Sequence, residues 1–282
     1  MPPMPKNGGA GLVALRRLRR QTRVSGALHM RTSQPTRRGL LAASLAGFAA
    51  GAAGQGCAPG GRGKQLSVVC VGGHPDDPES GCGGTLARYS EAGHKVSIVY
   101  LTRGERGIPG KSLDEAARIR TAEAQEACRI LKARPVFAGQ IDGATELNSG
   151  RVADFTKLLA AETPDLVFAQ WPLDTHMDHQ VAGLLTIRAY YALGGGFRLY
   201  FYEVDAGSQT QGYRPTDYIE ITAVREKKKS ALFAHKSQHG EEIYRRHHEL
   251  MENFRGREAR VTAAEAFVHL YCDTSPAELP LL

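Results

Sequence analysis

The sequence contains few of the residues that build thiolate sites. Its 282 residues include five cysteines and no Cys-x-x-Cys pair. This absence excludes the usual thiolate zinc site and the dithiol redox pair. Cys70 and Cys128 fall within an apolar strand pattern and a helical pattern, so we expect both to be buried thiols.

Acidic residues are missing from the first 75 positions. Residues 1–64 hold eleven Lys and Arg, and Asp76 is the first acid. The rest of the chain has 25 basic and 29 acidic residues, a net charge of −4, so the formal charge of +7 comes from the N-terminal segment. The basic composition therefore gives no support to nucleic-acid binding, and we expect no nucleic-acid partner.

The sequence also lacks an apolar run of the ~20 residues that span a membrane. The run 40–53 is shorter and follows Arg37-Arg38, which is typical of a secretory signal and resembles the twin-arginine type. We therefore expect an export leader over residues 1–57, with Met30 as an alternative start that gives it ordinary proportions. The expected location is the periplasmic or extracellular face.

The end of this leader, Gly56-Cys57, resembles a lipoprotein cleavage site. It departs from that pattern at Gly54, where Leu is usual. Cys57 is therefore a candidate lipid anchor to a membrane. Residues 58–64, which are rich in Gly, predict a flexible linker, and residues 65–282 predict one globular domain.

In the globular part, short apolar strands alternate with helical patterns. This alternation predicts βαβ units, a parallel twisted sheet and helices on both of its faces. The expected strands are 66–71, 95–101, 134–137, 165–170, 199–204 and 218–221, and the expected helices lie near 85–89, 114–131, 151–161, 179–193, 224–235 and 241–255.

Two clusters of His and Asp each follow an apolar strand. The first occupies 72–79 and contains His-Pro-Asp-Asp at 74–77; the second is Asp-x-His-x-Asp-His at 174–179. In open α/β sheets, ligands bind in the crevice at the carboxyl ends of the strands. The two clusters are therefore expected to converge on one metal ion.

The residue types in these clusters suit hydrolysis. His74, Asp77 and His179 could supply two imidazoles and a carboxylate, a set that suits Zn²⁺ and leaves a position for water. Asp76, beside a ligand, is placed to take the proton of that water. His176 could hold the oxyanion or protonate the leaving amine.

Asp178 could orient an imidazole as a partner outside the ligand set. The metal could also be Fe²⁺, because nitrogen and oxygen ligands do not choose firmly between the two ions.

Over about residues 66–271, the sequence resembles the PIG-L/LmbE-like deacetylases. The two clusters at 74–77 and 174–179 provide most of the resemblance. Weaker matches are Thr102-x-Gly104-Glu105, Arg120-x-x-Glu123-Ala124, His235-x-Ser237-Gln238 and Ala264-Glu265-Ala266-Phe267.

The resemblance implies a Rossmann-like three-layer α/β/α sandwich with a mostly parallel sheet. It also implies a zinc-dependent enzyme that removes N-acetyl groups, typically from molecules containing N-acetylglucosamine. The implied partner is an amino-sugar or glycoconjugate substrate.

The resemblance also implies roles for individual residues. His74, Asp77 and His179 are the implied metal ligands, and Asp76 is the implied general base. His176 is implied to stabilise the oxyanion or to act as the general acid, and Asp178 to support it. Glu105 and Arg120 are implied to contact sugar hydroxyls.

Other functions stay open at this stage. His74-x-Asp76 with a distant His also matches the ligands of non-haem Fe(II) oxygenases, although the alternation of strands and helices disfavours it. Gly81-Cys82-Gly83-Gly84 lacks the spacing of a dinucleotide site. The remaining alternatives are an amidase acting on a non-acetyl amide and a non-catalytic exported carbohydrate-binding protein.

Overall fold

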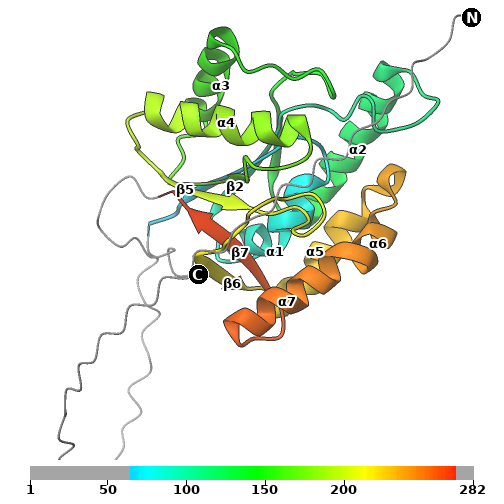
Figure 1. Cartoon of the computed structure of the whole chain (residues 1–282), viewed down its shortest axis with the longest axis vertical. Helices are drawn as coiled ribbons and strands as arrows, with labels where there is room; N and C mark the ends of the chain where they lie inside the picture. The colour runs from blue at the N-terminus through cyan, green and yellow to red at the C-terminus, as the bar shows by residue number, and fades with distance from the viewer. Residues whose placement is uncertain (1–63, 271–282) are drawn as a thin grey trace, which may run out of the picture. The chain divides into compact units, whose positions relative to one another are not determined.

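The computed structural model describes residues 64–270 of the chain (Figure 1). The predicted leader, the candidate anchor Cys57 and nearly all of the linker 58–64 lie outside the described residues. Within residues 64–270, none of the helices combines the length and the hydropathy of a membrane-spanning segment.

One seven-stranded sheet forms the centre of the described part, in the order β3-β2-β1-β4-β5-β7-β6. β1 to β5 pair in parallel, whereas β7 is antiparallel to both of its neighbours. This confirms the predicted α/β class and mostly parallel sheet. The strands are β1 (Ser67–Gly72), β2 (Lys95–Tyr100), β3 (Arg134–Phe137), β4 (Leu166–Gln170), β5 (Arg198–Tyr202), β6 (Asp217–Glu220) and β7 (Ala264–His269).

Helices cover both faces of the sheet, as predicted for three layers (Figure 1). α3 and α4 pack together on one face, and α1, α2 and α5 pack together on the other, with α7 against β7. The helices are α1 (Asp77–Glu91), α2 (Leu113–Leu131), α3 (Ser149–Ala161), α4 (Met177–Ala192), α5 (Arg225–Phe233), α6 (Gly240–Ile243) and α7 (Glu249–Ala259).

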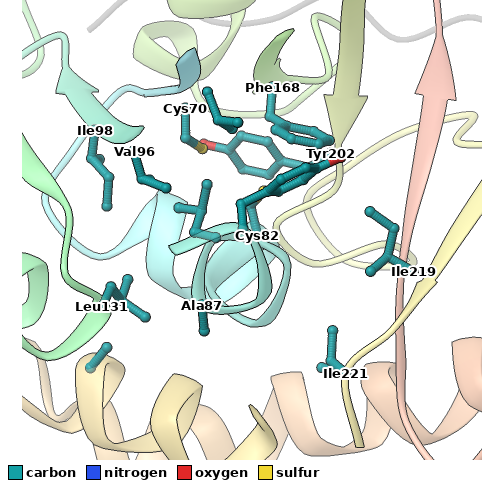
Figure 2. Close-up of a cluster of buried hydrophobic side chains, with 14 of the residues drawn as sticks. Cys70, Cys82, Ala87, Val96, Ile98, Leu131, Phe168, Tyr202, Ile219 and Ile221 are labelled. Carbon is teal, nitrogen blue, oxygen red and sulfur yellow. The ribbon is translucent and has the colours of Figure 1, made fainter. Parts of the chain in front are cut away.

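The alternation of side chains along β1 divides the core into two clusters. Val68 and Cys70 belong to the cluster beneath α1, part of which Figure 2 shows. Val69 and Val71 belong to the cluster beneath α3 and α4. A strand that is apolar on both faces is typical of a sheet covered on both sides. The predicted burial of the Cys70 thiol, and of Cys128, is confirmed.

Three parts of the chain differ from the expectation. The helix expected near 85–89 is α1, which begins earlier, at Asp77, and includes the glycines at 81, 83 and 84. The predicted helix 241–255 is interrupted by a π-helical turn, Tyr244–His248. β7 was not predicted as a strand. Its Glu265 accepts hydrogen bonds from the backbone of Gly84 and Thr85 in α1 and pairs with a buried lysine at 2.7 Å. A buried charge breaks the apolar pattern by which strands are recognised.

The strand order places the site. β1 has β2 on one side and β4 on the other, so the chain leaves β1 and β4 toward opposite faces of the sheet. The carboxyl ends of such neighbouring strands form a crevice between their two connections. β1 leads to the cluster at 74–77, and β4 leads to the cluster at 174–179.

Candidate metal centre and active site

The turn from β1 into α1 places three functional side chains within four residues. The His74 amide donates to Asp77 Oδ2 at 2.8 Å, which closes the turn. Asp76 has a φ of 109°, a backbone conformation that residues other than glycine rarely adopt. Its amide donates to Glu79 Oε2 at 3.2 Å, and Tyr100 donates to the other oxygen of Glu79 at 2.5 Å. Such a strained residue persists only where its surroundings hold it, and functional sites are common places for it.

Three candidate ligand atoms form a nearly equilateral triangle. His74 Nδ1, Asp77 Oδ2 and His179 Nε2 are each 3.2 Å from the other two. Ligand atoms about 2.0 Å from a tetrahedral zinc stand about 3.3 Å apart. Two imidazole nitrogens that face each other beside a carboxylate also need a shared proton or a cation between them. The donor set therefore fits a divalent metal.

The other nitrogen of each histidine is bound by a carboxylate. His74 Nε2 lies 3.0 Å from Asp178 Oδ2, and His179 Nδ1 lies 3.2 Å from Asp174 Oδ1. A metal-binding histidine normally donates its remaining N–H to such a partner, which fixes the tautomer and the ring orientation. Both rings are therefore oriented with Nδ1 of His74 and Nε2 of His179 toward the common point.

The carboxylates determine the protonation of the site. Burial alone would lower the pKa of His179, but Asp77 and Asp174 raise it to about 9. The pKa of His74 likewise stands well above its usual value, because hydrogen bonds to Asp142, Asp178 and Asp77 outweigh burial. The surrounding carboxylates therefore favour a positive charge between the two rings.

Asp76 lies beside the triangle and keeps 20 % of its side chain exposed. Arg120 Nη2 donates to Asp76 Oδ2 at 3.1 Å and to the carbonyl of Pro75 at 2.5 Å. Burial raises the pKa of Asp76, the Arg120 guanidinium opposes this rise, and the neighbouring Asp77 adds to it. A carboxylate with a raised pKa that is held in one orientation is suited to act as a general base.

His176 is the N-cap of α4 and stands next to both candidate histidine ligands. Its ring centroid is 4.7 Å from that of His74 and 4.7 Å from that of His179. The Asp178 amide donates to His176 Nδ1 at 3.2 Å, so in the neutral ring the proton is on Nε2. Burial lowers the pKa of His176, and the two neighbouring histidines lower it further. A neutral ring with a free Nε2–H is suited to donate to a developing oxyanion.

The structure places the Asp178 carboxylate against His74, whereas the resemblance implied that it supports His176. Gly143 and Thr145 also donate to this carboxylate, at 2.8 and 2.6 Å. The connection of Asp178 to His176 is through its backbone amide, because the side chain at the second position of α4 points back to the β1–α1 turn.

A cavity of about 750 Å³ opens over the triangle. Asp76, His176 and Arg120 line it together with Asp142 and Gln209, two residues that were not singled out individually from the sequence. Acidic and amide residues in irregular loops have no periodicity that could have identified them.

Glu105 is not among the described residues that line this cavity. It is 2 % exposed and accepts from the backbone of Asp142 at 3.1 Å and of Arg103 at 3.2 Å. This contact holds the loop that carries Asp142 against His74. A direct contact between Glu105 and a sugar, as the resemblance implied, is therefore not supported by its position.

The weaker motifs also meet in space. Glu123 of α2 accepts from the backbone and the hydroxyl of Ser237, at 2.7 and 2.6 Å. Gln238 donates to the carbonyl of Gly107 at 3.0 Å. These bonds join α2, the loop after β2 and the segment after α5 around the cavity.

Comparison with known proteins identifies the family. Residues 69–190 match the family model PIG-L, described as GlcNAc-PI de-N-acetylase. The conserved protein TT1542 from Thermus thermophilus shares 31 % identity, with a TM-score of 0.62, over 76 % of this chain and 100 % of that one. The chain belongs to the PIG-L family.

Two further relatives of this PIG-L protein are deacetylases. Diacetylchitobiose deacetylase from Thermococcus kodakarensis is 29 % identical over 192 residues, which are 63 % of this chain and 72 % of that protein. The structure of N,N'-diacetylchitobiose deacetylase from Pyrococcus horikoshii shares 27 % identity and a TM-score of 0.63, covering 72 % of this chain and 83 % of that one.

Proposed function

We propose that this protein is a metal-dependent hydrolase that removes N-acetyl groups from an N-acetylglucosamine-type sugar or glycoconjugate. The observation that carries the proposal is the 3.2 Å triangle of His74, Asp77 and His179 at the floor of a cavity. Asp76 and His176 line the same cavity beside it. The two deacetylases among its relatives support the acetyl group as the one removed.

His74, Asp77 and His179 would hold the ion, with Zn²⁺ the expected metal and Fe²⁺ the alternative. When bound, such an ion lowers the pKa of a water and polarises a carbonyl. Asp174 and Asp178 keep the two histidines in the tautomers that this binding needs.

Asp76 acts as the general base in this proposal. Its raised pKa and its exposure to the cavity suit it to take a proton from the attacking water. Arg120 keeps the carboxylate in place through the 3.1 Å bond, so the role we propose for Arg120 is to position Asp76. A sugar hydroxyl is a further partner for the guanidinium, because Arg120 also lines the cavity.

His176 stabilises the charge that develops on the carbonyl oxygen. Its Nδ1 is occupied by the Asp178 amide, which leaves Nε2–H for the substrate. Oxyanion donors of this kind typically contribute 10²–10³-fold in rate. The lowered pKa of His176 keeps the ring neutral and favours this role. Asp76 then passes the proton that it accepted from the water to the leaving amine.

We also propose that the protein works outside the cytoplasm, after export by the leader 1–57, with Cys57 as its candidate anchor to the membrane. The basic, acid-free leader supports export, and a glycan or glycoconjugate met outside the cytoplasm is then the expected substrate.

Metal content is the first test, measured on the full chain and on His179→Ala. We expect about one equivalent of Zn²⁺ or Fe²⁺ in the wild type and almost none in the variant. His94→Ala is the control, because His94 binds the Leu66 backbone at the opposite ends of the strands. A folded wild type that takes up no metal would refute the metal-dependent mechanism and favour the carbohydrate-binding alternative.

The second test is acyl release from a panel of N-acetylglucosamine oligosaccharides and matched N-formyl and N-propionyl sugars. We expect acetate as the main product. Preferred release of another acid would identify an amidase with a different acyl group. Binding of the sugars by metal-loaded protein without any release would refute the enzymatic proposal.

A further inference from the structure

The segment after β5 lies against the second metal-binding cluster. We call residues 204–211 the strap. Its Gln211 amide donates to the Leu173 carbonyl at 2.8 Å, and its Gln209 carbonyl accepts from Thr175 at 3.1 Å. These backbone bonds connect the strap to the chain that leads from β4 to His176 and His179, about thirty residues earlier.

Thr210 is the buried centre of the strap. It is 3 % exposed, and its hydroxyl donates to Asp174 Oδ2 at 3.2 Å. The same oxygen accepts from the backbone of Val204 at 3.1 Å and of Asp205 at 3.3 Å. A hydroxyl has one proton and two lone pairs, so all of its capacity is used. Thr210 therefore closes the strap on itself and fastens it to Asp174.

Asp174 passes this constraint to the ligand. Its Oδ1 lies 3.2 Å from His179 Nδ1 and accepts from the His176 backbone at 2.8 Å. Gln209 of the strap places its amide nitrogen 2.9 Å from the same His179 Nδ1. The strap thus reaches His179 through the Thr210 hydroxyl and Asp174, and the Gln209 amide group lies beside the same ring.

We infer that the strap is part of the metal centre and that Thr210 is a positioning residue that holds Asp174 in the orientation that His179 needs to bind the ion. Thr210 is not among the described residues that line the cavity, so an effect of its hydroxyl must pass through Asp174. The inference rests on the proposed metal site and adds a residue that no motif in the sequence identifies.

The experiment measures Zn²⁺ affinity of the full chain by competition with a chelating dye at pH 7.5. Thr210→Val removes the hydroxyl and keeps the shape, and we expect it to weaken Zn²⁺ binding about tenfold, the lower end of the range for partners of ligating groups. Thr210→Ser retains the hydroxyl, and we expect its affinity within threefold of the wild type.

Thr186→Val is the matched control. Thr186 is fully buried in the same helix as His179, and its hydroxyl donates to the Ala182 carbonyl at 2.8 Å. This control loses a buried hydroxyl without touching the strap, and we expect its Zn²⁺ affinity to be unchanged.

At saturating Zn²⁺ we expect the KM of Thr210→Val to match that of the wild type, because Thr210 does not face the cavity.

The outcomes separate this inference from the proposed function. Zn²⁺ affinity of a folded Thr210→Val equal to that of the wild type, or equally reduced in Thr186→Val, would overturn the inference and leave the proposed function intact. A wild type that binds no metal would overturn both. If Thr210→Val does not fold, Thr210→Ala removes the same hydroxyl, and a wild-type affinity there has the same meaning.

Discussion

Asp178 offers the sharpest test of how the site is organised, because the structure and the family resemblance assign its carboxylate to different partners. The carboxylate accepts from His74 Nε2 at 3.0 Å, from Gly143 at 2.8 Å and from Thr145 at 2.6 Å, and its side chain is fully buried. These bonds hold the pKa of Asp178 well below its usual range, although burial opposes them. The carboxylate is therefore charged throughout the range in which the protein would bind metal.

Two substitutions at Asp178 should produce graded losses of metal affinity. In Asp178→Asn, the amide oxygen can still accept from His74 and Gly143 while the amide nitrogen donates to Thr145, so only the charge is lost. A charge-assisted hydrogen bond is about twice as strong as a neutral one. Asp178→Ala removes the whole bond to His74, which is worth about 1.5–3 kcal/mol for a charged partner.

These energies translate directly into affinity, because about 1.4 kcal/mol corresponds to a tenfold change. We expect Zn²⁺ to bind about 3- to 10-fold more weakly to Asp178→Asn and about 10- to 100-fold more weakly to Asp178→Ala. Competition with a chelating dye measures both. Asp154→Asn and Asp154→Ala are matched controls, because Asp154 is exposed on α3.

The result that would refute this reasoning is specific. If the carboxylate supports His176 alone, Asp178→Ala would lower kcat at saturating metal and leave the Zn²⁺ affinity within twofold of the wild type. If Asp178→Ala instead binds Zn²⁺ more weakly and regains its kcat when excess metal is added, the carboxylate acts on His74.

Three further predictions follow from other contacts. Asp76→Asn should keep the metal but lose at least 10²-fold in kcat, because the base is gone; deacetylation assays on the metal-loaded variant measure this, and full activity would exclude Asp76 as the base. The pKa of His179 is raised to about 9, above its unfolded value of about 6.5, so its pairing with Asp77 stabilises the metal-free protein below pH 6.5, and this stabilisation is lost as the pH rises through 9. Thermal unfolding of metal-free protein should therefore show a Tm that falls over this range, with a smaller fall in His179→Gln; an equal fall in both would contradict the assignment. Lys228→Met should reduce the free energy of unfolding in urea by about 3–5 kcal/mol, because the buried ammonium binds two buried carboxylates at 2.9 and 2.7 Å and both would lose this cation, whereas Lys229→Met, at a partly exposed ion pair, should cost at most about 1 kcal/mol.

Much of the candidate metal centre could be predicted because its candidate ligands are local to two strand ends. His74 and Asp77 are three residues apart in one turn, and His179 follows β4, the neighbour of β1. The carboxyl ends of adjacent parallel strands share one edge of the sheet, so the alternation of strands and helices was enough to bring the two clusters together.

The partners of these ligands could not be predicted in the same way. Asp142 and Thr210 lie in irregular loops, and their roles depend on the paths by which those loops return to the site. Loops have no hydrophobic period, and a carboxylate or hydroxyl in one is equally compatible with solvent. Glu105 was assigned to the substrate from its motif, yet its burial beneath the loop of Asp142 gives it a structural contact.

The sequence by itself therefore determined the α/β class, the convergence of the two clusters and the identity of the candidate ligands, because these depend on short-range order along the chain and on one rule of parallel sheets. Only the tertiary structure decided which carboxylate orients which histidine, that Asp178 faces His74, and that the strap fastens Asp174. The contacts of Asp178 with His74 and of Thr210 with Asp174 join residues 104 and 36 positions apart, and their geometry is set by the packing of loops and helix ends, which no local pattern encodes.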